Sequence, residues 1–176
     1  SRLHAEVSER MFPEFKPIIP ITNGVHHLTW VSEPVAGLFD EYCPGWKENP
    51  ALLKKIGDYI SDQEFIGKMW EAHQTAKSEL FRYVEEKSGE KFDPNVFTIG
   101  FARRFAGYKR GDLIFADIKK LIKLAEKWGP IQLIFAGKAH PADGIGRSIL
   151  EDTIARGREA AVLSKGKVRF VFLENY

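Results

Sequence analysis

The chain has 176 residues, of which 44% are hydrophobic, so it can bury one sizeable core or one core and part of a second. Its 26 basic and 24 acidic residues leave a net charge of +2, an excess too small to indicate nucleic-acid binding. No segment is apolar enough to predict a membrane span or a signal peptide, and the single cysteine, Cys43, can form no internal disulfide. We therefore expect a soluble protein of a reducing, cytoplasmic compartment.

The first half of the chain, residues 1–88, is predicted to be mostly helical. Residues 1–11 already follow a helical pattern and carry no initiating Met, so we expect the chain to be an internal fragment of a longer protein. Further along, Asn49 followed by Pro50 marks the start of a short helix, because Asn is a good N-cap and Pro fits the first helical turn.

The longest helix is predicted to begin at a capping box, Ser61-x-x-Glu64, and to end at the polar segment 88–91. From there on, alternating strand and helix patterns replace the purely helical periodicity. We therefore expect a domain boundary at this segment. Residues 1–88 would form the C-terminal part of one domain, and residues 89–176 would begin the next.

The second half of the chain alternates between strands and helices. Strands are predicted at residues 96–101, 131–136 and 168–173, and helices at 112–128 and 145–163. This βαβαβ order predicts an α/β fold with a parallel sheet, equivalent to half of a Rossmann-like nucleotide-binding domain.

The first predicted strand is followed by a run of cations that contains no acid. Its members are Arg103, Arg104, Lys109 and Arg110. The small residues Ala106 and Gly107 within this run would let a ligand approach the backbone closely. Because parallel α/β sheets bind ligands at the carboxyl ends of their strands, we expect this loop to hold an anion, and phosphate in particular. The residues by themselves also allow a solvated turn that binds nothing.

Two further polar segments follow the other predicted strands. Gly137-Lys138-Ala139-His140-Pro141 comes after the second strand, and Glu174-Asn175-Tyr176 comes after the third. Parallel strands end at one edge of a sheet, so we expect these segments to meet the cationic loop there. For Lys138 and His140, stabilisation of their own loop is as good an interpretation as ligand contact.

The remaining histidines do not predict a metal site. His26 and His27 are adjacent, and no other His, Cys or acid stands nearby at ligand spacing. His73 and Lys77 lie on or beside the apolar face of the longest helix. We favour packing as the role of both over a contact with a ligand, and we assign neither to a site.

The motif Arg103-Arg104-x-x-x-Tyr108-Lys109-Arg110 resembles the basic signature of the α-glucan phosphorylases, the glycogen and maltodextrin phosphorylase family. Three more stretches resemble the family in the same order. They are Thr22-Asn23-Gly24-Val25 with Trp30, Phe135-Ala136-Gly137-Lys138-Ala139, and Phe172-Leu173-Glu174-Asn175-Tyr176. The resemblance therefore runs nearly from end to end.

Within the cationic loop the sequence departs from the better-known members. It has Arg103 where they carry Lys, and Phe105-Ala106-Gly107 where they carry Ile-His-Glu. In these respects it is more similar to the short bacterial and archaeal branch, so regulation through effector sites is not carried over.

The resemblance implies a GT-B fold of two Rossmann-like domains and the reversible phosphorolysis of an α-1,4-glucan to glucose 1-phosphate with pyridoxal phosphate. It implies that Arg104 and Lys109 hold the substrate phosphate and that Arg103 and Tyr176 lie beside the cofactor phosphate. The family's Schiff-base lysine would lie beyond Tyr176, outside this chain. The isolated chain is therefore expected to be inactive.

Two other functions remain open from the sequence. One is a nucleotide-sugar glycosyltransferase of the glycogen-synthase kind, which would share the GT-B plan and use an Arg and a Lys to hold a diphosphate. The other is a non-catalytic module that binds glucan or an anion. The expected partners under the phosphorylase interpretation are α-1,4-glucan, inorganic phosphate and glucose 1-phosphate, with neither nucleic acid nor a membrane.

Overall fold

The computed structural model describes residues 1–174, and the chain divides into two compact units, Ser1–Ala72 and His73–Tyr176. The division falls inside the longest helix, α4 (Gln63–Ser88). The domain boundary expected at 88/89 in a longer protein stays a prediction. Among residues 1–174, no helix is long and apolar enough to cross a membrane.

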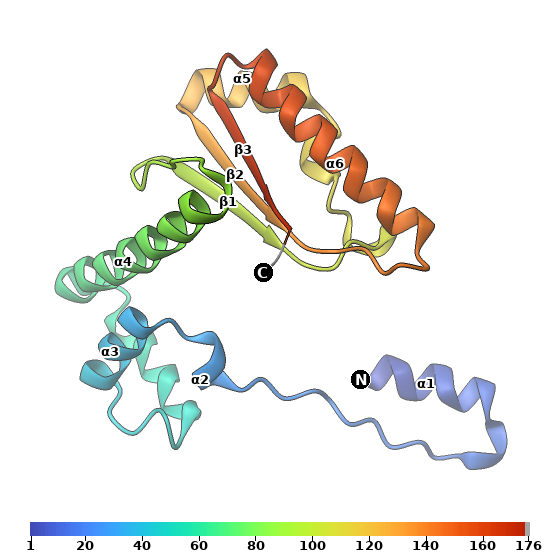
Figure 1. Ribbon diagram of the computed structural model, residues 1–176. Coiled ribbons are helices and arrows are strands. Elements are labelled where there is room, and N and C mark those ends of the chain that lie inside the picture. Colours follow the sequence, from blue (N-terminus) through green and yellow to red (C-terminus); the bar gives the residue numbers. More distant parts are fainter. Residues whose placement is uncertain (175–176) are drawn as a thin grey trace. The chain divides into compact units, whose positions relative to one another are not determined.

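The described elements of the first unit are all helical (Figure 1). They are α1 (Arg2–Met11), the 3₁₀ helix η1 (Pro13–Phe15), α2 (His27–Trp30), α3 (Glu33–Tyr42), the 3₁₀ helix η2 (Pro50–Tyr59) and the first turns of α4. Asn49 caps η2 as expected, since its side chain accepts a hydrogen bond from the backbone N–H of Ala51.

The capping box predicted for α4 is wrong by one residue. The carboxylate of Asp62, and not the hydroxyl of Ser61, accepts the backbone N–H groups of Glu64 at 2.8 Å and Phe65 at 3.2 Å. A charged acceptor makes a stronger bond to these amides than a hydroxyl does, so the helix begins at the residue after Asp62.

A buried tryptophan is the centre of the small core in the first unit. Trp46 is 1% exposed, and Cys43 and Leu38 are buried as well. The indole Nε1 of Trp46 donates to Asp40 at 2.9 Å, and the ammonium of Lys47 donates to the other carboxylate oxygen at 2.7 Å. The bonds from Lys47 and Trp46 hold the pKa of Asp40 below its ordinary value.

The second unit contains a sheet of three parallel strands in the order β1-β2-β3. The strands are β1 (Phe97–Ala102), β2 (Ile131–Ala136) and β3 (Val168–Leu173). Their register is straight, because Phe97 pairs with Ile131 and Ile131 with Val168. The predicted α/β class and parallel sheet are confirmed, and β1 differs from its predicted range by one residue.

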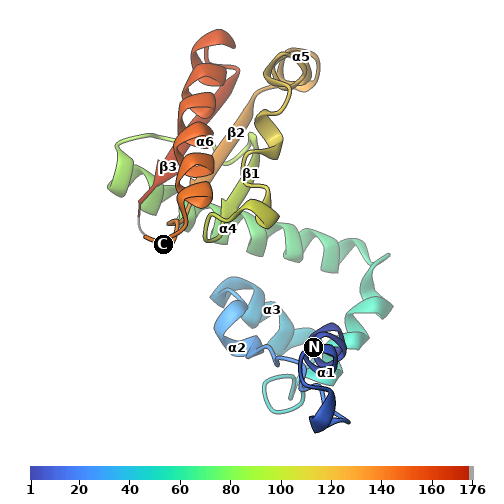
Figure 2. The same ribbon diagram turned by 90° about the vertical axis from the view of Figure 1, so that its right-hand side faces the viewer.

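Helices cover both faces of this sheet (Figure 2). On one face lie α5 (Ile118–Trp128) and α6 (Gly144–Leu163), and on the other lies the C-terminal half of α4. Gly157 lets α6 approach β3, since a Cβ there would lie 2.5 Å from the ring of Phe170. β2 is buried along nearly its whole length, which explains its continuous apolar sequence.

The connection between α4 and β1, residues 89–96, is tied to the unit by polar side chains. Three long side chains hold it, namely Lys77, Gln132 and Arg169. Buried Gln132 exchanges two hydrogen bonds with the main chain of Asp93, and Lys77 donates to the carbonyls of Pro94 and Val96 at 2.8 Å each. Arg169 reaches the carboxylate of Glu90 and the carbonyl of Lys91. The role of Lys77 in this unit is therefore to fix a loop.

The helix predicted from residue 112 begins later than expected. A 3₁₀ turn, η4 (Leu113–Phe115), comes first, and α5 begins after Asp117. The carboxylate of Asp117 accepts the backbone N–H of Lys120 at 2.9 Å, whereas Asp112 makes no side-chain cap. The predicted start of this helix at residue 112 is therefore wrong, because a separate 3₁₀ turn precedes Asp117.

Asp117→Ala should therefore lower the free energy of unfolding by about 1 kcal/mol, the usual cost of losing a helix N-cap. Asp112→Ala is the matched control and should change it little, because its side chain caps no helix. Urea unfolding of the two variants measures this difference. Equal losses in both would contradict the observed start of α5.

Candidate functional site

The carboxyl ends of all three strands lie at one edge of the sheet. Because the strands are parallel and in register, Ala102, Ala136 and Leu173 are aligned across it. The chain therefore leaves the sheet on the same side after each strand. This places the cationic loop (residues 103–110) beside the segment that follows β2, as the sequence predicts.

The cations of this loop are available to a ligand. Arg103, Arg104 and Arg110 are exposed, and Lys109 is half-buried. Within residues 1–174 none of the four forms an ion pair with a carboxylate. The ammonium of Lys109 lies 5.6 Å from the centre of the Tyr108 ring, a contact that leaves its charge uncancelled. An anion at this loop would meet positive charge without competition from a described acid.

The backbone of the loop turns sharply after its first two cations. A 3₁₀ turn, η3 (Gly107–Lys109), is followed by Arg110 in the left-handed conformation, with φ 49° and ψ 48°. A residue with a side chain pays roughly 1 kcal/mol or more for this conformation, so the surrounding contacts must enforce it. The turn therefore has a defined shape.

Hydrogen bonds join the cationic loop to the segment after β2. The backbone N–H of Arg103 donates to the carbonyl of Ala136 at 3.2 Å, and that of Phe105 donates to the carbonyl of Lys138 at 3.0 Å. Phe105 also forms an isolated parallel bridge with Ala139. Pairing thus continues beyond the ends of β1 and β2, and the two loops share one framework.

Glycines allow the main chains to come this close. A Cβ on Gly137, whose φ is +147°, would lie 2.1 Å from the carbonyl oxygen of Arg103. A Cβ on Gly146, in the first turn of α6, would lie 2.6 Å from the carbonyl oxygen of Phe105. Neither site has room for a side chain, so both glycines are needed for the packing of the loops.

The N-terminus of α6 is occupied by the protein itself. The carboxylate of Asp143 accepts the backbone N–H of Gly146 at 2.8 Å and caps the helix. His140 accepts the backbone N–H of Ala142 through Nδ1 at 3.1 Å. In this structure His140 therefore stabilises its own loop, and the positive end of α6 already faces a carboxylate.

A cavity of about 350 Å³ lies at the ends of β2 and β3 on the α6 side. Apolar walls from Leu150, Ile154 and Phe172 are combined with the cations Lys138 and Arg158. Arg158 is not among the site residues predicted from the sequence. The sequence feature that could have indicated its position is the four-residue spacing of Leu150, Ile154 and Arg158, which places the three residues on one face of a helix.

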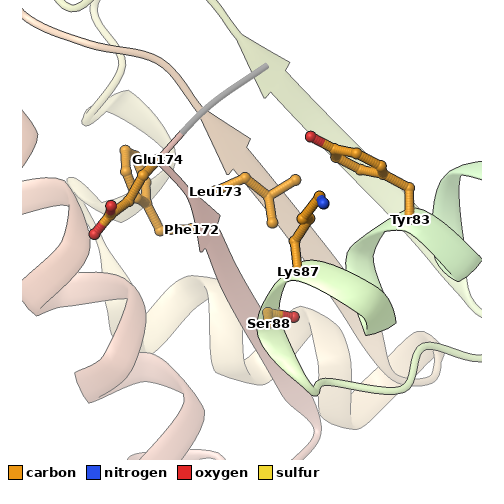
Figure 3. Close-up of a pocket in the computed structure, with 6 residues that line it drawn as sticks. All are labelled: Tyr83, Lys87, Ser88, Phe172, Leu173 and Glu174. Atoms are coloured by element: carbon orange, nitrogen blue, oxygen red, sulfur yellow. The ribbon is translucent and has the colours of Figure 1, made fainter.

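A second cavity, of about 390 Å³, lies on the α4 side of the same strand end. Figure 3 shows Leu173 pointing toward Tyr83 and Lys87 of α4, whereas Phe172 and Glu174 point to the other side of β3. A hydrogen bond and ion pair of 2.9 Å with Glu86 raise the pKa of Lys87 above its ordinary value. The end of β3 thus borders a cavity on each face.

No group of three His, Cys, Asp or Glu side chains in residues 1–174 is arranged to hold a metal ion. The ring of His27 bonds to the carbonyl of Lys47 at 3.0 Å, and the ring of His26 bonds to the hydroxyl of Thr29 at 2.7 Å. These two histidines therefore make local contacts within the first unit.

Comparison with known proteins identifies the family. A family model described as carbohydrate phosphorylase matches residues 1–176. The chain belongs to the carbohydrate phosphorylase family. The predicted resemblance to the α-glucan phosphorylases is thereby confirmed.

Several curated phosphorylases are similar to this chain. The glycogen phosphorylase of Aquifex aeolicus is 35% identical over 86% of this chain and 25% of its own length. The maltodextrin phosphorylase of Thermococcus litoralis is 32% identical over 100% of this chain and 23% of its own. The glycogen phosphorylase of Mycobacterium tuberculosis is 30% identical over 100% of this chain and 22% of its own. The chain thus spans about a quarter of the length of these relatives.

The phosphorylase site residues predicted from the sequence are placed as follows. Arg103, Arg104 and Lys109 lie in one loop at the carboxyl edge of the sheet. Tyr176 lies outside the described residues. The roles assigned to all four stay predictions. Phe105 is not among the predicted site residues, although a large apolar residue among cations indicates a buried position.

Gly146→Ala in this phosphorylase chain should lower the free energy of unfolding by about 1–3 kcal/mol, the usual cost of overpacking. The added methyl group would lie 2.6 Å from the carbonyl oxygen of Phe105. Gly144→Ala is the control from the same helical turn, since its Cβ would meet no heavy atom within 4 Å. Chemical unfolding of both variants tests this, and equal midpoints would argue against the close approach of α6 to the loop.

Proposed function

We propose that this chain is part of an α-1,4-glucan phosphorylase, a glycosyltransferase that reversibly converts glycogen or maltodextrin and inorganic phosphate into glucose 1-phosphate. One observation carries the proposal. Arg103, Arg104 and Lys109 lie in one loop at the carboxyl edge of a parallel sheet, and no described acid forms an ion pair with them. The chain that carries this loop is matched over residues 1–176 by the phosphorylase family. The names of the similar glycogen and maltodextrin phosphorylases support it.

Within such an enzyme we assign the chain to a GT-B arrangement of two Rossmann-like domains. Residues 1–88 would be the helical end of the N-terminal domain, and residues 89–176 would be the first half of the C-terminal one. The three parallel strands of the second unit support this assignment. We propose a cytoplasmic location with it, which the single buried, unpaired Cys43 supports.

In this proposal Arg104 and Lys109 bind the substrate phosphate. The planar guanidinium of Arg104 can donate two parallel hydrogen bonds to phosphate oxygens, and the ammonium of Lys109 adds a compact charge. Negative charge on the attacking phosphate and positive charge at the anomeric carbon would then be stabilised electrostatically, without a protein nucleophile. Half-buried Lys109 would lose less of its effect to solvent than a fully exposed lysine.

The cofactor proposed with this function is pyridoxal phosphate. When bound, it would supply a second phosphate group beside the substrate phosphate. Two unit charges 4 Å apart repel by about 4 kcal/mol at an effective dielectric constant near 20, so cations must lie between such groups. The donor set of the loop fits this need. Arg103 would hold the cofactor phosphate, with Tyr176 beside it and the Schiff-base lysine outside this chain.

The other two candidate functions have less support. A nucleotide-sugar glycosyltransferase would use a similar Arg and Lys, but the family match over residues 1–176 favours phosphorolysis. A non-catalytic glucan- or anion-binding module has less support because the similar curated proteins are named phosphorylases.

Arg104→Ala or Lys109→Ala in the full-length protein should lower phosphorolysis by about 100-fold or more, because each removes a charge-assisted contact used in the transition state. Folding stability should hardly change, since loop cations contribute little to a core. Lys123→Ala, an exposed cation on α5, is the control and should leave both quantities unchanged. Near-normal turnover of both loop variants at saturating phosphate would refute the assignment.

The isolated 176-residue chain should release no glucose 1-phosphate from maltodextrin and form no borohydride-reducible Schiff base. One wall of the proposed cleft and the cofactor lysine would both be absent, so water would replace the preorganised groups. Phosphate should still bind weakly, and added salt should weaken it further. Robust turnover by the isolated chain would overturn the residue roles given above.

A further inference from the structure

We propose that Phe105 is a positioning residue for the cationic loop, setting the place of Arg103 and Arg104 before it and of Lys109 after it. This inference rests on the proposed phosphorolysis and names a residue that controls phosphate binding at that site. It comes from the burial, the hydrogen bonds and the ring contacts of Phe105.

Phe105 is the one buried residue of the loop 103–110. It is 2% exposed, whereas Arg103 and Arg104 are exposed and Lys109 is half-buried. The cations make no ion pair within residues 1–174, so side-chain partners do not hold them. Their location is therefore set by the backbone, and the loop backbone has its buried attachment at Phe105.

The ring of Phe105 fills a narrow slot. Its centre lies 5.5 Å from the ring of Phe101 on β1 and 6.1 Å from that of Phe172 on β3. Two glycines close the slot, because a Cβ on Gly111 would lie 2.9 Å from the ring and one on Gly137 would lie 3.3 Å from it. The ring cannot shift without moving β1, β3 or one of these loops.

The main chain of Phe105 is held on both sides. Its N–H donates to the carbonyl of Lys138 at 3.0 Å, and its own carbonyl oxygen packs against Gly146 of α6. A shift at Phe105 would therefore move the residues on either side of it together. Charged contacts to phosphate need correct placement to well within 1 Å, so such a shift should weaken phosphate binding before it disrupts the fold.

Phe115 provides the matched comparison. It belongs to the same core cluster and is 0% exposed, and its ring contacts Phe135 and Phe170. It lies in η4, after the loop, and makes none of the contacts between the loop and the segment after β2. Replacing Phe115 removes a core ring without releasing the cations.

The experiment compares Phe105→Leu with Phe115→Leu in the full-length protein, in the phosphorolysis direction. Phe105→Leu should raise the KM for phosphate by about tenfold or more and leave the KM for maltodextrin unchanged. Phe115→Leu should lower the melting temperature about as much as Phe105→Leu does, because each removes a buried ring. It should leave the KM for phosphate unchanged. The methyl group added by Gly111→Ala would lie 2.9 Å from the ring of Phe105 and displace it. This variant should therefore raise the KM for phosphate as Phe105→Leu does.

An unchanged KM for phosphate in Phe105→Leu, or an equal rise in Phe115→Leu, would overturn the inference while the proposed function stands. If Phe105→Leu does not fold, Gly111→Ala decides by the same criterion. Absence of phosphate-dependent glucan cleavage in the unsubstituted protein would instead overturn the proposed function, and the inference with it.

Discussion

The parallel, in-register pairing of three strands is the constraint on which the candidate site depends. It brings the ends of β1, β2 and β3 to one edge, so the loops that follow β1 and β2, although far apart in sequence, share a small space there. The loops meet this constraint by close contact of their main chains. At Gly137 and Gly146 the main chains are so close that there is no room for a Cβ. The backbone hydrogen bonds donated by Arg103 and Phe105 continue the pairing of β1 with β2 beyond the ends of these strands.

The same edge combines a rigid backbone with uncompensated charge. A folded chain usually neutralises clustered cations with nearby acids, yet the cations of the loop 103–110 have no such partner within residues 1–174. Exposure to water keeps their mutual repulsion small, because solvent screens it. The arrangement is typical of a site that acquires its counter-charge from a ligand. The acid nearest to the positive end of α6, Asp143, caps that helix and so does not neutralise the loop.

Local patterns did not locate the starts of two helices. Ser61 and Asp62 are both good N-caps, and the structure uses Asp62. The helix predicted from residue 112 begins only after Asp117, which caps it. The domain boundary expected at segment 88–91 rests on the change there from helical periodicity to alternating strands and helices, and it stays a prediction. The neighbouring residues 90–96 are bonded to Lys77, Gln132 and Arg169, two of which lie on strands distant in sequence.

The sequence alone determined the three strands, the parallel α/β class, the family and the cationic loop, because each is written in residues adjacent along the chain. Apolar runs of strand length and unbroken charge need no tertiary contact to be recognised. Three features became visible only in the tertiary structure. Phe105 is the buried attachment of the cationic loop. Arg158 lines a cavity together with Lys138, and Lys77 fixes a distant loop. These features depend on distances between segments separated by up to tens of residues, and local periodicity does not encode such distances.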